Sequence, residues 1–160
     1  MGLTLKDTDR GYAALVARVF AAAKEKPTIS VGLLEGDGAQ PHGEKDVDEA
    51  VTVLQVAIWN HFGTDNIPAR PFITAWFDES ESALRADLVV LMQSVVRGER
   101  TSAQILELMG QRCVAQIQAR MAEGVPPPNA PSTIKAKGSS TPLVNEGILR
   151  SSVSYRVEGG

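Results

Sequence analysis

The sequence predicts an α+β fold in a single domain of 160 residues. Three observations lead to this prediction. Long stretches repeat apolar residues at the three-and-four spacing of a helix face, two short stretches alternate as strands do, and glycines and prolines separate them. We expect about four helices packed with a small, mostly antiparallel sheet, with long loops and an extended C-terminal segment. Loop insertions are expected at 35–45 and 125–141, within the one domain 1–160.

The N-terminal part of the chain predicts one helix followed by one strand. Between Asp9 and Lys24, apolar residues recur on one helix face, and Pro27 closes the helix. The stretch Thr28–Leu34 then alternates apolar and small residues, which is typical of a strand with one buried face. Residues 35–45 are rich in glycine and charge and therefore predict a loop.

A second helix is predicted from Asp46, because Glu49 three residues later completes a capping box. Gly63 would end this helix. Its expected buried stripe consists of Val47, Ala50, Val51, Leu54, Ala57, Ile58 and either His61 or Phe62. The two prolines that follow, within Ile67–Phe72, predict a rigid elbow between helices, because each proline holds its predecessor in an extended conformation.

Two long helices are predicted next. Pro71 suits the first turn of one of them, which runs to about Arg97. Thr101 and Gln104 form a second capping box that opens the other, and Gly124 stops it. The inward-facing residues of this last helix are expected to be Ile105, Leu106, Met109, Cys113, Ile117 and Met121.

The C-terminal part predicts a second strand. Three prolines at 126–128 form a stiff extended stretch, and residues 132–137 suit one short helical turn. Gly147 is expected to supply a turn before Ser152–Val157, whose alternation predicts a strand that pairs with Thr28–Leu34. Two strands alone make a marginal sheet. A further strand could come from the long loop or from a neighbouring subunit.

Composition argues against several functional classes. The net charge is −3, and 16 basic residues are scattered among 19 acidic ones, so tight autonomous binding of nucleic acid is not expected. No apolar stretch approaches the roughly 20 residues that a membrane span needs, and the first residues lack a signal-peptide pattern. The single cysteine, Cys113, fits synthesis in a reducing cytoplasm and is expected to pack in the core.

Two segments resemble one family of proteins. Ile58–Thr64 followed by Ile67–Phe72 reads IWNHFGT and IPARPF. This pair resembles the motif of tail-component and virion-morphogenesis proteins of tailed bacteriophages, where a helix ends in aromatic-Gly-Thr and leads into Ile-Pro-Ala-Arg-Pro-Phe. Pro142–Tyr155 resembles the C-terminal signature of the same proteins. Asn145 and Glu146 depart from it, because the family commonly has Asp at the first position and Thr or Ser at the second.

The resemblance implies a structural virion protein with no enzymatic activity and no cofactor. Such a protein would form a ring at the head–tail junction or the top of the tail tube, complete the tail, join it to the head connector and let DNA pass. The implied partners are further copies of itself in a six- or twelve-fold ring, head–tail connector or stopper proteins, and a tail terminator or tail tube protein. Contact with packaged DNA would be transient, and no membrane would be involved. The protein would be made in the host bacterial cytoplasm and reside in the neck or tail of the virion.

Two alternatives stay open. Within the structural class, the chain could be a tail terminator or a head-side stopper. From another class, it could be a small metal-dependent phage hydrolase or nuclease that uses His42, Glu44 and Asp46 as metal ligands. One histidine and two carboxylates on a loop are a weak metal signal, so we interpret this stretch as solvated.

The residues expected to form the subunit interface or its structural motif lie in the two resembling segments. They are Phe62, Gly63, Ile67, Pro68, Arg70, Pro71, Phe72, Leu143, Gly147, Leu149 and Arg150. The elbow would fix the direction of Arg70, which suits a bidentate pair with a carboxylate within or between subunits. Alternatively, Arg70 satisfies helix-end carbonyls in a plain helix–loop–helix corner. Phe62, Ile67 and Phe72 are expected to pack together beneath the elbow.

The acidic residues of the long loop are candidates for lining a DNA channel, where they would repel the passing duplex. They are Glu35, Asp37, Glu44 and Asp46. A solvated loop without this role is the alternative.

Overall fold

The computed structural model of the chain describes residues 11–34, 36, 51–129, 135 and 147–159. Within them the order of elements is α1 (Tyr12–Glu25), β1 (Thr28–Gly32), α2 (Val53–Phe62), α3 (Phe72–Val96), α4 (Ser102–Glu123), α6 (Ile148–Ser151) and β2 (Ser154–Glu158). Four longer helices and a two-stranded antiparallel sheet confirm the predicted α+β class.

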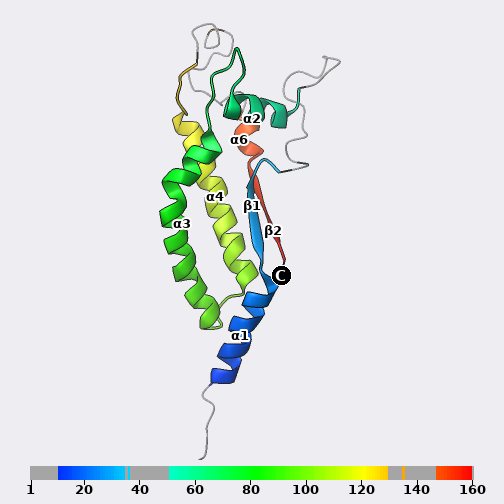
Figure 1. Ribbon diagram of the computed structural model, residues 1–160, viewed down its shortest axis with the longest axis vertical. Helices are drawn as coiled ribbons and strands as arrows, with labels where there is room; N and C mark the ends of the chain where they lie inside the picture. Colours follow the sequence, from blue (N-terminus) through cyan, green and yellow to red (C-terminus); the bar gives the residue numbers. More distant parts are fainter. Residues whose placement is uncertain (1–10, 35, 37–50, 130–134, 136–146, 160) are drawn as a thin grey trace, which may run out of the picture.

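The molecule is elongated, with α4 at its centre (Figure 1). The long helices α3 and α4 pack side by side, and the ribbon of β1 and β2 packs on α4. At one end, α2 and the short α6 lie in contact above the ribbon. At the opposite end, α1 extends past the turn that joins α3 to α4 and touches only the end of the body.

The predicted pairing of the two strands is confirmed. They run antiparallel, with Thr28 opposite Glu158 and Gly32 opposite Ser154. The ribbon approaches α4 closely at Gly110, where a Cβ atom would come within 3 Å of the ring of Tyr155. The Tyr155 hydroxyl donates a hydrogen bond of 2.6 Å to Glu107 on the same helix. A glycine at this point of α4 therefore lets the sheet lie against the helix.

The capping box predicted for α4 is confirmed. Thr101 accepts a hydrogen bond from the backbone N–H of Gln104, and the Gln104 side chain accepts one from the backbone N–H of Thr101. Five of the six residues expected to face inward are buried, and Leu106 is half-buried. They lie one or two turns apart, so the three-and-four spacing alone identified this face.

The start of α2 differs from the prediction. The helix begins at Val53, and Thr52 before it is extended and forms a capping box with Gln55. Because Thr52 is not helical, a helix opened at Asp46 cannot run into α2. Asp46 and Glu49 themselves lie outside the described residues. Thr52 and Gln55 have the same spacing as Asp46 and Glu49, and they form the capping box at the start of α2.

The main core brings α2, the start of α3 and the C-terminal segment against α4. Its buried residues are Val53, Ala57, Phe72, Trp76, Cys113, Ile117, Met121, Val125, Leu149 and Val153. The expectation that Cys113 packs in the core is confirmed, and burial raises the pKa of its thiol. This thiol is therefore held in its unreactive protonated form.

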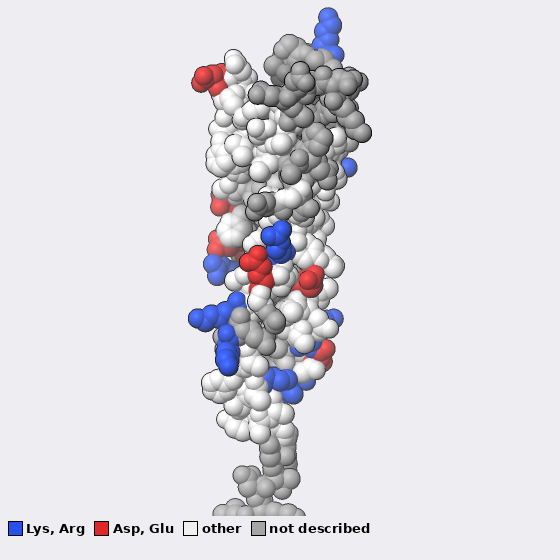
Figure 2. All heavy atoms as spheres, turned by 90° about the vertical axis from the view of Figure 1, so that its right-hand side faces the viewer, with Lys and Arg blue, Asp and Glu red and all other residues white. Residues whose placement is uncertain are grey.

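Charged side chains of both signs are interspersed on the face that carries the ribbon (Figure 2). No continuous band of Lys and Arg runs along that face among the side chains that the figure colours. None of the helices in the described part of the chain is long and apolar enough to cross a membrane.

Candidate functional site

The elbow between α2 and α3 is held by a compact set of backbone hydrogen bonds. Thr64 and Ile67 bond each other in both directions, at 2.8 and 3.2 Å, and the N–H of Arg70 donates to the carbonyl of Asn60 at 2.6 Å. Gly63 has a φ of 80°, and a Cβ there would lie 2.9 Å from the backbone nitrogen of Ala69. Only glycine fits at this position, because both the left-handed conformation and the close chain exclude a side chain.

Arg70 points from this elbow into the protein. Its side chain is buried, with the residue 4% exposed, and it donates to the carbonyl oxygens of Pro127 at 2.7 Å and Pro128 at 3.2 Å. Weaker contacts reach the side-chain oxygens of Asn129 at 3.4 Å and Asn60 at 3.5 Å. Burial lowers the pKa of Arg70, but a guanidinium keeps its charge throughout the physiological range. Arg70 therefore ties the elbow to the proline stretch that follows α4.

These contacts are of the kind expected for the intramolecular alternative, in which Arg70 satisfies backbone carbonyls. The acceptors lie just beyond the end of α4, in a segment some 57 residues away in the chain. No carboxylate bonds Arg70 within the described residues. The local pattern IPARPF could not reveal this partner, since nothing in it points to residues 127–129.

The two segments that carry the family resemblance meet in one core. Phe72, at the end of the elbow, is 1% exposed, and Leu149, in the C-terminal segment, is 2% exposed. Both belong to the cluster that also contains Val53 and Ala57 of α2. Two motifs separated by about half of the chain thus form one structural unit at the α2–α6 end of the molecule.

The other motif residues divide between surface and turn positions. Gly147 has a φ of 74° and precedes α6, as expected for a turn. Pro68, Pro71 and Arg150 are exposed, and Ile67 is half-buried. Leu143, the loop acids Glu35, Asp37, Glu44 and Asp46, and the metal candidate His42 lie outside the described residues.

Phe62 corrects the prediction that it packs beneath the elbow with Ile67 and Phe72. Its ring is 74% exposed, whereas Phe72 is buried. The reason is the rotation of α2, whose buried residues are Val53 and Ala57. The face that carries Leu54, Ile58 and Phe62 is turned outward instead.

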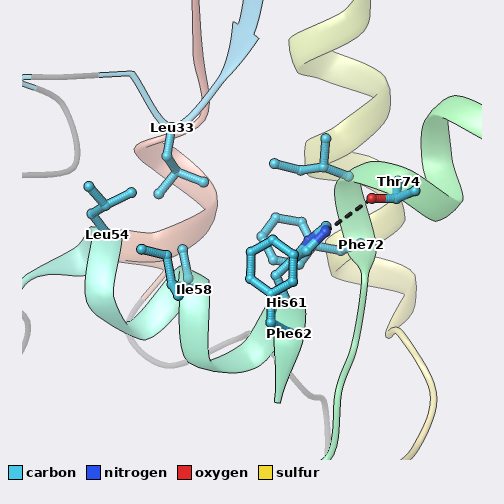
Figure 3. Close-up of a pocket in the computed structure, with 9 residues that line it drawn as sticks. Leu33, Leu54, Ile58, His61, Phe62, Phe72 and Thr74 are labelled. Atoms are coloured by element: carbon cyan, nitrogen blue, oxygen red, sulfur yellow. Dashed lines mark hydrogen bonds between the residues drawn. The ribbon is translucent and has the colours of Figure 1, made fainter. Parts of the chain in front are cut away.

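That outward face borders an apolar hollow of about 210 Å³ (Figure 3). Leu33, Leu54 and Ile58 lie along one side of it, and His61, Phe62 and Phe72 lie along the other. Leu54 is 38% exposed and Ile58 is 45% exposed, so the helix presents large aliphatic side chains to solvent at the rim. A second apolar hollow, of about 330 Å³, lies between β1 and α3 over α4. Ile73 lines both hollows.

His61 is the titratable group of the first hollow. Its Nε2 lies in a hydrogen bond 3.0 Å from Oγ1 of Thr74, and its ring packs edge-on against Phe72 at 5.3 Å between centroids. Burial lowers its pKa from the ordinary value of 6.5. The partly buried site therefore favours the neutral imidazole of His61.

The lowered pKa of His61 predicts a loss of stability in mild acid. The unfolded chain takes up a proton near pH 6.5 while the folded chain resists it, so stability falls as the pH drops from that value through the lower folded-state pKa. The variant His61→Gln should show a flatter pH dependence of the free energy of unfolding than wild type, measured by urea denaturation between about pH 8 and about pH 5. His42→Gln, which alters the only other histidine, is the control. An equal flattening in both variants would contradict the assignment to His61.

Metal-ligand side chains do not cluster among the described residues. No group of three or more His, Cys, Asp or Glu side chains that could hold a metal ion occurs in that part of the chain. The features of the site are instead an interlocked elbow and two adjoining apolar hollows. No protein-family model matches the chain, and no curated protein or solved structure is significantly similar to it.

Proposed function

We propose that this chain is a structural subunit of a tailed-phage particle that assembles into a ring at the head–tail junction or the top of the tail tube. In that position it completes the tail, joins it to the head connector and lets DNA pass, without enzymatic turnover or a cofactor. The second reading within this class is a tail terminator or a head-side stopper. The proposal takes the role from the resemblance of the two motif segments.

The observation that carries the proposal is the apolar surface of the isolated chain. Single exposed apolar residues are normal, but contiguous patches mark interaction surfaces. The described residues with large exposed apolar side chains are Tyr12, Val19, Phe20, Leu54, Ile58, Trp59, Phe62, Phe77, Leu88, Val89, Val90, Val96 and Leu108. Most of them lie on α1 at one end of the elongated molecule, on α2 at the other end and along α3 between them, and Leu108 lies on α4. A cyclic oligomer needs two different complementary faces on each subunit, and separated patches meet that need.

The interlocked elbow is a second observation that supports the same role. Arg70 and Phe72 fix the corner between α2 and α3 within the chain. The exposed residues Leu54, Ile58 and Phe62 are therefore presented on a rigid support. Rigid presentation lowers the entropy lost on association, as is useful for a subunit that must add to a growing particle.

Cryo-electron microscopy of phage particles tests the proposal directly. The particles would be purified from a host that carries the whole gene cluster encoding this chain. We expect density for a closed ring of this chain between the head connector and the tail tube, with six- or twelve-fold symmetry. Absence of the chain from mature particles would contradict the structural role. It would favour a role as an assembly factor or as the metal-dependent hydrolase.

A further inference from the structure

Helix α1 carries an exposed apolar face that the body of the molecule does not cover. Val19 is 47% exposed and Phe20 is 71% exposed, and Val16 lies on the same side of the helix. Tyr12, four residues before Val16, is 73% exposed on that side too. The spacing of these residues, i, i+4, i+7 and i+8, is that of an amphipathic helix that lays its apolar face into a groove.

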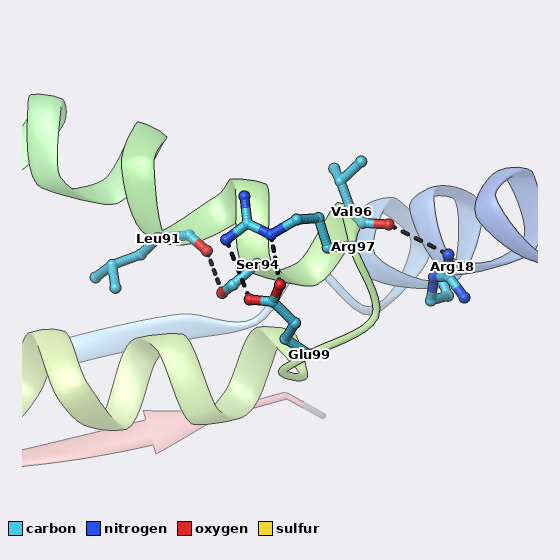
Figure 4. A network of polar contacts seen from close by, with 6 residues as sticks. All are labelled: Arg18, Leu91, Ser94, Val96, Arg97 and Glu99. Carbon is cyan, nitrogen blue, oxygen red and sulfur yellow. Dashed lines mark hydrogen bonds and ion pairs between the residues drawn. The ribbon is translucent and has the colours of Figure 1, made fainter.

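The opposite side of α1 anchors the helix at the far end of the body. Arg18 donates a hydrogen bond of 3.2 Å to the carbonyl of Val96, the last residue of α3, and its guanidinium packs against Gly98 (Figure 4). On a helix, Arg18 and Phe20 point in nearly opposite directions. The anchor therefore aims Phe20 away from the protein that holds it.

An apolar groove of fitting size lies on the same molecule, between β1 and α3 with α4 as its floor. This is the hollow of about 330 Å³, and its lining residues are Ile29, Val31, Ile73, Trp76, Phe77 and Leu84, with Met109 and Cys113 below. Phe77 at its rim is 46% exposed. From Ile73 to Leu84 the groove follows α3 for about 17 Å, and the α1 face from Tyr12 to Phe20 is about 12 Å long, at 1.5 Å per residue.

In this structure α1 does not fill the groove of its own chain. It is anchored at Val96, and the nearer end of the groove, Leu84, lies about 18 Å away along α3. The link from α1 to β1 is two residues, Lys26 and Pro27, and α1 extends from it away from the groove (Figure 1). The groove is therefore open to an α1 helix from another copy.

The charges around the two surfaces are complementary. At the C-terminal end of α1, Lys24 and Lys26 stand against the single Glu25, whereas Arg18 points the other way, toward Val96. The part of α3 that borders the groove, residues 72–84, contains three acidic residues and no Lys or Arg. Two of those acids pair with arginines at the surface, Glu79 with Arg120 and Glu81 with Arg85, while Asp78 is exposed. Opposite charge favours the encounter of a basic helix with this rim.

We propose that the α1 face of one subunit docks into the α3–β1 groove of a second copy of this chain, and that this contact joins successive subunits. The contact is heterologous, since it uses one surface on each partner and leaves the other pair free for the next subunit. It rests on the proposed ring for its biological setting, but it is a property of the isolated chain and can be tested without a particle.

Two matched variants test the contact. Phe20→Glu places a charge on the α1 face, and Phe77→Glu places one at the rim of the groove, at positions exposed enough for the subunit to keep its fold. Val89→Glu, on the other side of α3 and 63% exposed, is the control for loss of an exposed apolar side chain. Association is measured by size-exclusion chromatography with light scattering over a range of concentrations, and thermal unfolding confirms that each variant is folded.

The expected pattern is specific to a contact between two different surfaces. Wild type and Val89→Glu should form oligomers, and Phe20→Glu and Phe77→Glu should each be at least tenfold weaker in association. An equimolar mixture of the two defective variants should form a one-to-one heterodimer and stop there, because it holds one intact groove and one intact α1 face.

Three outcomes overturn the proposal. The first is a wild-type chain that stays monomeric throughout. The second is a mixture of the two variants without a heterodimer. The third is an oligomer that persists in both variants, which leaves ring assembly standing but assigns it to another surface. If instead the heterodimer forms and mature particles contain no ring of this chain, the contact stands and the proposed function fails.

Discussion

Replacing Arg70 by alanine is expected to lower the free energy of unfolding by about 3 kcal/mol, because hydrogen bonds to a charged group are worth about 1.5–3 kcal/mol and their buried partners are left unsatisfied. The carbonyl oxygens of Pro127 and Pro128 would lose their hydrogen-bond donor. Arg70 is 4% exposed, so these hydrogen bonds are buried. Arg70→Lys should recover little of the loss, since a lysine cannot reach two acceptors with a planar fork. Urea denaturation followed by circular dichroism measures the change.

The matched control is Arg85→Ala. Arg85 also makes two hydrogen bonds, in its case both to Glu81, but its side chain is 77% exposed. An exposed pair one helical turn apart contributes about 0.3–0.5 kcal/mol. Equal losses in Arg70→Ala and Arg85→Ala would show that the elbow does not depend on the contact with the proline stretch.

Replacing Phe72 by alanine is expected to cost about 3–5 kcal/mol, because it removes a large buried side chain from the core. Phe72 is 1% exposed and lies in the core cluster that joins α2, α4 and α6. Phe77, on the same helix, provides an internal comparison, since it is 46% exposed. Phe77→Ala should cost about 1 kcal/mol or less in the monomer, as partly exposed apolar side chains gain little from folding.

Both variants should be measured at a concentration where the chain is monomeric, so that association does not add to stability. A loss in Phe77→Ala as large as that in Phe72→Ala would mean that the α3–β1 groove is filled within the chain. The comparison thus distinguishes Phe72, which packs in the core at the elbow, from Phe77, which lies exposed at the rim of the groove.

The long helices and the two strands could be predicted from local signals. The spacing of Ile105, Met109 and Cys113 identified the inner face of α4, and Thr101 with Gln104 fixed its start. Such signals act within one or two turns, where backbone hydrogen bonds and capping are decided. The same logic erred at the start of α2, because Thr52 and Gln55 have the same spacing as Asp46 and Glu49, and it is Thr52 that caps the helix.

The motif segments show which features could not be predicted from the sequence. Both were recognisable as patterns, but the pattern did not say that Phe72 is buried and Phe62 exposed. Nor did it name the carbonyls of Pro127 and Pro128 as the acceptors for Arg70. The short helix α6, only four residues long, carried no periodicity that could have predicted it.

The sequence by itself determined helices α1, α3 and α4 and the two strands, and that one face of each is apolar. Only the tertiary structure decided which apolar faces find a partner inside the chain. The α4 face meets both α3 and the ribbon, whereas the outer faces of α1 and α2 are left at the surface. The physical reason is that helix periodicity reports the chemistry of a face but not what lies opposite it, and burial depends on contacts between residues far apart in the chain.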